Sequence, residues 1–245
     1  MMKTLNSLLA ASVAIMLGCA SVNAQLIDDF SGGLSGYTQT TILDVTPGAS
    51  NATVFSSSTG ALDIDTTGYQ DIQQIAFIYD GLTLGVGEEL KADVMGGTIA
   101  GSRNFGLYVG GTAPAYNVRE DYITSYGGSN ANERIFSRGF DGTSEYDNPG
   151  ANPTGLAQLF IARTASNTFE AGFYDSTGRI VVTTRTPAAA NTADFVGFYA
   201  DIRADGTVGA FDNLMVSAVP EPGTALLSLF AAFGVVAVSR RSERR

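Results

Sequence analysis

Between residues 25 and 218 the chain is built of short segments in which apolar and polar residues alternate with a period of two. In "TFEAGFYD" (168–175), Phe169, Ala171 and Phe173 fall on one side of an extended chain, as in a strand that buries one face. No long segment of this region repeats its apolar residues every 3.6 positions, so we expect no helix there. The alternation therefore predicts antiparallel β-structure.

Eight segments are clear strand candidates, namely residues 71–80, 88–95, 104–111, 155–164, 168–175, 179–186, 194–203 and 208–217. Weaker candidates are residues 26–30, 61–65 and 121–126. Turn residues separate them, as in "DSTG" (175–178), where Asp and Gly favour chain reversal. Gly127 to Pro153 is rich in Gly, Asn, Asp and Ser, and we expect a long loop there. Strands that recur roughly every ten residues favour a single β-sandwich or barrel domain.

The N-terminus differs from this body and predicts export. Residues 1–24 carry Lys3, an apolar run from Leu8 to Leu17, and small residues before a cut after Ala24. This is the pattern of a secretory signal peptide. An open alternative is lipoprotein processing at Cys19, where the thiol would carry a lipid.

The C-terminus, residues 219–245, predicts a membrane tether. Its polar landmarks are Pro220, Glu221 and Pro222 at the start, and Arg240 and Arg241 near the end. Between them, residues 223–239 are uncharged and mostly apolar. As a helix they would measure roughly 26 Å, close to the ~30 Å core of a bilayer. Arginines prefer the cytoplasmic side, so the body would lie outside the inner membrane.

The order of tripeptide, apolar run and arginine cluster resembles the PEP-CTERM sorting signal of Gram-negative bacteria that make extracellular polysaccharide or biofilm. The resemblance covers residues 219–241. It implies an exosortase, a membrane cysteine transpeptidase, as a partner that cuts near the tripeptide. The protein would then be inserted transiently in the inner membrane and end at the cell surface or in the extracellular matrix. The alternative is an ordinary tail-anchoring helix.

The two ends of the body carry a second resemblance. The segments "LIDDFSGGLSGYTQ" (26–39) and "VGAFDNLMVS" (208–217) resemble the first and last strands of concanavalin A-like jelly rolls, the fold of legume lectins and many glucanases. This implies an all-β, two-sheet antiparallel jelly-roll sandwich over residues 25–218. Many such domains hold a structural calcium between these strands, so Asp28, Asp29 and Asp212 are candidate ligands. The alternative is that these are solvated turn carboxylates.

The composition excludes several chemistries. The chain has no histidine, and its one cysteine lies in the predicted signal peptide, which rules out a Ser-His-Asp triad, His-ligated zinc and a thiol nucleophile in the body. The Glu-x-Asp-x-x-Glu strand typical of jelly-roll glycosidases is not found, so we expect no enzyme. A glycosidase stays open as an alternative, because paired carboxylates can come from distant strands. Residues 25–219 hold 22 acidic and 9 basic residues, and such a surface repels nucleic acid.

The composition is compatible with sugar binding even though the chain has no tryptophan. A tyrosine ring can give sugars a stacking face, and the central third of the chain supplies the candidates Tyr108, Tyr116, Tyr122, Tyr126 and Tyr146. The predicted function is therefore a non-catalytic, polysaccharide-binding or adhesive domain. Two alternatives stay open: that the tyrosines only pack at sheet edges, and that the body is a structural envelope or matrix component without a specific ligand.

Overall fold

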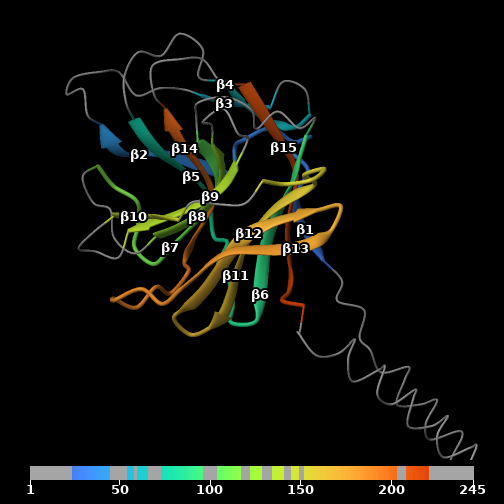
Figure 1. Cartoon of the computed structure of the whole chain (residues 1–245). Helices are drawn as coiled ribbons and strands as arrows, with labels where there is room; N and C mark the ends of the chain where they lie inside the picture. The colour runs from blue at the N-terminus through green and yellow to red at the C-terminus, as the bar shows by residue number, and fades with distance from the viewer. Residues whose placement is uncertain are drawn as a thin grey trace, which may run out of the picture. The chain divides into compact units, whose positions relative to one another are not determined.

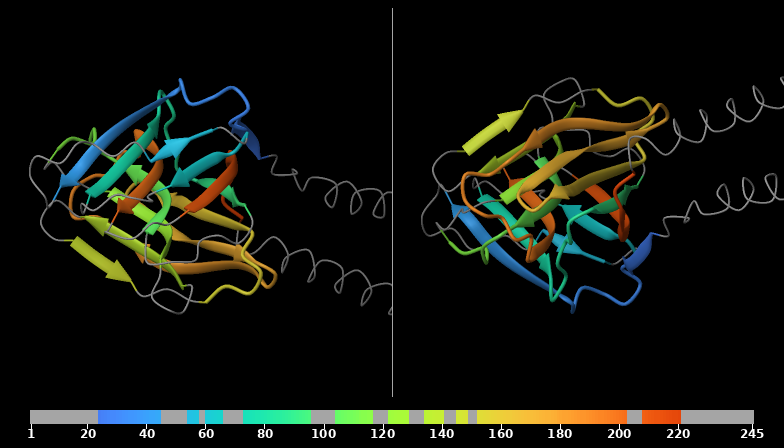
Figure 2. Two further views of the ribbon diagram at one scale, coloured as in Figure 1. Left: turned by 90° about the horizontal axis from the view of Figure 1, so that it is seen from above. Right: turned by 90° about the horizontal axis from the view of Figure 1, so that it is seen from below.

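The computed structural model describes residues 24–44, 54–57, 60–65, 73–95, 104–116, 122–128, 134–140, 145–148, 152–202 and 208–220. Within them, Ala24 to Val219 form one compact unit (Figure 1). The regular structure of these residues is entirely β-strand, arranged in two antiparallel sheets (Figures 1 and 2). The prediction of an all-β fold with two antiparallel sheets is confirmed, and the arrangement is consistent with a jelly roll. The helices predicted at the two ends lie outside the described residues.

One sheet, sheet A, has eight strands in the described part of the chain, in the order β13-β12-β11-β6-β15-β4-β3, with β1 also paired to β15. Its strands are β1 (Gln25–Asp28), β3 (Phe55–Ser56), β4 (Leu62–Asp65), β6 (Glu88–Val94), β11 (Gln158–Ala165), β12 (Thr168–Asp175), β13 (Gly178–Arg185) and β15 (Val208–Ala218). The long β15 pairs with β4 through its first half and with β1 through its second. The first and last strands of the body therefore lie side by side, as Figure 1 shows.

The other sheet, sheet B, has seven strands over the same residues, in the order β10-β9-β8-β7-β14-β5-β2. Its strands are β2 (Tyr37–Asp44), β5 (Gln73–Tyr79), β7 (Asn104–Gly110), β8 (Tyr122–Gly128), β9 (Arg134–Phe140), β10 (Glu145–Asn148) and β14 (Phe195–Ile202). β14 lies at its centre, between β7 and β5. This order puts β2 at one edge, with β14 and β5 between it and β7.

The core lies between the two sheets because each strand turns its apolar side inward. Strands β11, β12 and β13 of sheet A lie against β8 and β9 of sheet B. The alternation predicted for β12 is confirmed: Phe169, Ala171 and Phe173 are buried in this core. Aromatic rings fill much of it, and Phe198 of β14 packs 5.4 Å from Phe211 of β15 between ring centroids.

All eleven strand candidates are confirmed, but four strands were not predicted. β9 and β10 lie inside the expected loop of residues 127–153, which is a correction to that prediction. In β9 the core-facing positions after Ile135 are Ser137 and Gly139. These small residues are not apolar enough to produce the alternation that marks a strand in the sequence. β2 and the two-residue β3 were also missed, β2 because threonines and a glutamine fill its middle.

Candidate ligand-binding site

A hollow of about 360 Å³ lies beside the edge strand of sheet B. Gln39, Thr40 and Thr41 of β2 line it, together with Tyr116 from the segment that follows β7. Tyr116 is 53% exposed, one of the few large apolar or aromatic side chains that reach solvent in the described chain. We call this hollow, defined by these four residues, the β2 hollow.

The β2 hollow combines the groups that recognise a sugar. A tyrosine ring offers an apolar face, the glutamine amide donates and accepts hydrogen bonds, and threonine hydroxyls do both. Its volume falls in the range of roughly 300–1,000 Å³ that small-molecule sites occupy. These uncharged groups could hold a hydroxyl-rich ligand, and none of them is a carboxylate of the kind that glycosidases use in pairs.

The start of β2 is fixed to the body, which gives the hollow a rigid wall. The ring of Tyr37 stacks on Phe77 of β5, with ring centroids 4.6 Å apart and planes 5° from parallel. One residue later, Thr38 Oγ1 donates a 3.0 Å hydrogen bond to Asp80. Antiparallel pairing with β5 continues along the strand, with a bulge between Thr41 and Leu43.

Of the five tyrosines predicted as sugar platforms, Tyr116 alone has a placed and exposed ring. Tyr108 and Tyr122 are 2% and 0% exposed, which corrects their assignment because a buried ring has no face for a ligand. Burial, and then the neighbouring Tyr122, raises the pKa of the Tyr108 phenol. Tyr126 and Tyr146 belong to β8 and β10, and their side chains lie outside the described structure.

The buried tyrosines form a row on the face of sheet B that points away from the core. Tyr108 stacks on Tyr122 at 5.4 Å, and Tyr122 stacks on Tyr199 at 6.2 Å, between ring centroids. Next to this row, Arg138 Nη1 lies 2.6 Å from Asp201 Oδ2 and 3.5 Å from the Tyr199 hydroxyl. Arg138 and Asp201 are 9% and 1% exposed. In this buried ion pair the charge of each side chain is compensated by the other.

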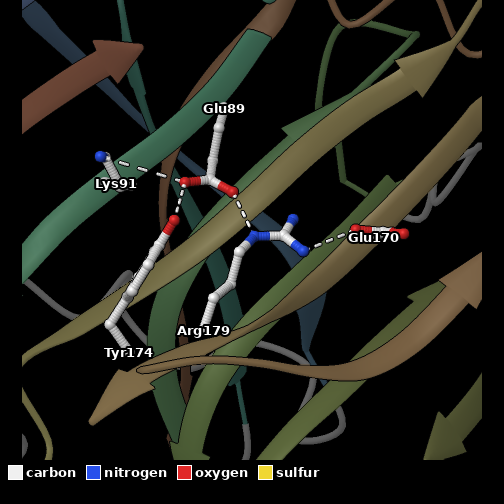
Figure 3. Close-up of polar contacts among 5 residues, drawn as sticks. All are labelled: Glu89, Lys91, Glu170, Tyr174 and Arg179. Carbon is white, nitrogen blue, oxygen red and sulfur yellow. Dashed lines mark hydrogen bonds and ion pairs between the residues drawn. The ribbon is translucent and has the colours of Figure 1, made fainter. Parts of the chain in front are cut away.

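A second polar cluster lies on the outer face of sheet A and surrounds Glu89 of β6 (Figure 3). Tyr174 donates to Glu89 Oε1 at 2.8 Å, and Arg179 Nε donates to Glu89 Oε2 at 2.8 Å. Arg179 Nη1 also lies 2.8 Å from Glu170, and Lys91 lies 4.0 Å from Glu89. The Glu89 side chain is 0% exposed. We call these five residues the Glu89 cluster.

Contacts across the sheet hold Arg179 in place within the Glu89 cluster. Its guanidinium lies 4.0 Å from the ring centroid of Phe160, and the residue paired to Phe160 on β12 is Gly172. A Cβ at Gly172 would collide with the Ile180 carbonyl, so only glycine fits. Burial alone would lower the pKa of Arg179, but the hydrogen bonds to Glu89 and Glu170 outweigh it and the pKa is raised.

The Glu89 cluster brings two carboxylates together, which raises the question of glycosidase chemistry. A substrate would have to reach both carboxylates, yet Glu89 is wholly buried and Arg179 binds both. Burial and the hydrogen bond to Glu89 raise the pKa of the Tyr174 phenol, which opposes any role of Tyr174 as a base near neutral pH. The cluster therefore has the properties of a structural ion network.

The predicted calcium ligands lie near one another in the topology but are engaged in local turns. β1 and β15 pair, with Asp28 opposite Leu214. Asp28 accepts from the Phe30 amide, and Asp212 from the Asn213 amide. Hydrogen bonds from Ser31 lower the pKa of Asp29. In the described part of the chain no three His, Cys, Asp or Glu side chains are grouped to hold a metal, and calcium binding stays a prediction.

The processing residues lie mostly beyond what the structure describes. Ala24 directly precedes β1, and Pro220 follows β15 by two residues. Glu221, Pro222, Arg240 and Arg241 lie outside the described residues, as do the predicted signal peptide and membrane helix. Among the described residues, no helix has the length and apolar character to cross a membrane.

Comparison with known proteins gives distant structural likenesses. The exoplasmic/lumenal domain of VIP36, in a form bound to Ca²⁺ and Man3GlcNAc, is 9% identical with a TM-score of 0.49, over 82% of this chain and 93% of that one. Alginate lyase AlyC3, in complex with dimannuronate, is 10% identical with a TM-score of 0.46, over 79% and 93%. A xylan beta-1,4-xylosidase from Bacillus halodurans C-125 is 12% identical with a TM-score of 0.47, over 69% of this chain.

This chain spans 35% of the xylosidase's length. No protein-family model matches the sequence, and no curated protein matches it. Likenesses this distant carry no information about the ligand or the activity of the chain. Its function must therefore be argued from its own residues.

Proposed function

We propose that the body is a non-catalytic carbohydrate-binding domain of an exported protein, and that the β2 hollow is its binding site. The observation that carries this proposal is the exposed ring of Tyr116 beside the polar side chains of Gln39 and Thr40, in a hollow that the largely buried Thr41 also lines. The other polar groupings described above are closed by internal ion pairs. The β2 hollow is open to a ligand and carries the chemistry that suits hydroxyl groups.

Replacing Tyr116 by alanine should weaken polysaccharide binding by tenfold or more, because ring stacking contributes about 0.5–1.5 kcal/mol beyond the apolar area it buries. Tyr116→Phe keeps the ring and should stay within about threefold of wild type. Binding would be found on a glycan array and measured by calorimetry. Val86→Ala is the control, since Val86 is also exposed, at 57%, but lies in the turn before β6.

Two results would contradict the proposal. Equal binding by wild type and Tyr116→Ala would remove the β2 hollow as the site. If wild-type protein bound no glycan at all, the alternative of a structural matrix component without a specific ligand would stand.

We also propose that the C-terminal tail is an exosortase sorting signal, which would bring the body to the cell surface or the matrix. The support is the order of Pro220-Glu221-Pro222, apolar run and arginines. Two prolines exclude helix across the tripeptide and keep it extended for an active site. The body itself ends as a strand at Ala218, directly before this segment.

Changing Pro220, Glu221 and Pro222 together to alanine should leave export intact and block removal of the tail. Unprocessed protein should then accumulate in the inner membrane, which fractionation and immunoblotting would detect. A lysine substitution at Val86 serves as a matched surface control that leaves the tail unchanged. Equal release of the alanine variant and the wild type from cells would contradict exosortase processing.

A further inference from the structure

The charges around the β2 hollow indicate whether it would bind a neutral or an anionic polysaccharide. Among the residues that the structure describes, the four that line it are uncharged. A carboxylate is bonded to the start of β2, because Thr38 donates a hydrogen bond to Asp80. An anionic sugar would therefore meet negative charge beside the site.

The basic side chains that the structure places are engaged elsewhere. Arg138 is bound to Asp201, Arg179 to Glu89 and Glu170, and Lys91 lies beside Glu89. Arg163 donates to the backbone carbonyls of Leu84, Ser166 and Thr192, and Arg185 also has a partner. These side chains come from β6, β9, β11 and β13. None of them belongs to β2 or to the segment that carries Tyr116.

The charge of the whole body adds to this local field. Residues 25–219 hold 22 acidic and 9 basic residues, and the five residues after Tyr116 include one arginine and two acidic residues. A polyanion that approaches such a domain is repelled, and the repulsion is strongest at low ionic strength. Proteins that bind carboxylated or sulfated ligands usually present arginine or lysine to them.

We propose that the ligand of the β2 hollow is a neutral polysaccharide, built of hexoses or pentoses without uronate or sulfate groups. This rests on the carbohydrate-binding function proposed above and narrows it to one substrate class. Tyr116 stacks on the apolar face of a sugar ring, while the polar side chains of Gln39 and Thr40 bond its hydroxyls. The acidic surroundings select against anionic polymers.

The test measures binding of the body, residues 24–219, which form one compact unit with its own core. The neutral probes are arabinoxylan, galactomannan and mixed-linkage β-glucan, and the anionic probes are alginate and polygalacturonate. At least one neutral polymer should bind with an affinity that changes less than about twofold between about 20 mM and about 500 mM salt. Both polyuronates should bind at least about tenfold more weakly at the lower salt concentration.

Each outcome bears on a different claim. If a polyuronate binds best at low salt and Tyr116→Ala abolishes that binding, the neutral class is overturned while the carbohydrate site stands. If a neutral polymer binds equally well to wild type and Tyr116→Ala, the β2 hollow is overturned as the site, and the class assigned to it falls too. If none of the polymers binds, both the class and the proposed function are overturned.

Discussion

Phe173→Asp should unfold the body. Phe173 is 1% exposed in the core between the two sheets, where it pairs with Leu159 on β11 and Ile180 on β13. Loss of a buried phenylalanine costs about 3–5 kcal/mol, and an unpaired buried carboxylate costs several more. Since single domains have about 5–15 kcal/mol of stability in total, little or none would remain. Circular dichroism and thermal melting would measure the loss.

Val181→Asp is the matched control for this prediction. Val181 lies on β13 opposite Gly172, the residue before Phe173, and is 40% exposed. An aspartate there stays in water, so stability should change by less than about 1 kcal/mol. Tyr174 would be a poor control because its hydroxyl donates to the buried Glu89. A stable Phe173→Asp protein would contradict the register, because a slip of one residue exchanges the two faces.

Arg179→Met should destabilise the body by about 3–5 kcal/mol, the range seen when one partner of a buried ion pair is removed. Methionine keeps much of the volume of the side chain over Phe160, but Glu89 loses a 2.8 Å hydrogen bond and its charge partner. Glu89 would remain 0% exposed with only Tyr174 and the more distant Lys91 beside it. Urea unfolding, followed by tyrosine fluorescence, would give the free energy of unfolding.

The double variant Glu89→Gln/Arg179→Met separates charge from packing. Removing both charges should recover a large part of the lost stability, because replacing a whole buried ion pair is far less disruptive than breaking it. A single Arg179→Met variant within 1 kcal/mol of wild type would show that water reaches Glu89. The Glu89 cluster would then be an ordinary surface ion network, for which about 0–1 kcal/mol per pair is typical.

Most of the strands could be predicted from sequence because period-two alternation marks strands that bury one face. β12 and β14 show this plainly, with Phe169 and Phe198 among their inward residues. β2 was not predicted because it is an edge strand and its middle consists of the polar residues Gln39, Thr40 and Thr41. The polar residues that disguise β2 in the sequence also line the hollow, so a strand that was not predicted carries the proposed site.

The site was only partly within reach of sequence reasoning. Tyr116 could be named as one of several tyrosines, but nothing local distinguishes it from Tyr108 or Tyr122, which the fold buries. Tyr116 lies near β2 only because of the fold, since β14 and β5 separate β7 from β2 in sheet B. The Glu89 cluster is still less local, since Glu89 and Arg179 are 90 residues apart. Such contacts follow from tertiary pairing and leave no periodic signal.

Chemical-shift mapping tests the central claim, that the β2 hollow binds carbohydrate, most directly. The ¹⁵N-labelled body would be titrated with short oligosaccharides of the polymer that binds best. We predict that the amides of Gln39, Thr40, Thr41 and Tyr116 shift together and saturably, while those of Glu89 and Arg179 on the outer face of sheet A stay unchanged. Saturable shifts confined to other strands, with the amides of β2 and Tyr116 unmoved, would contradict it.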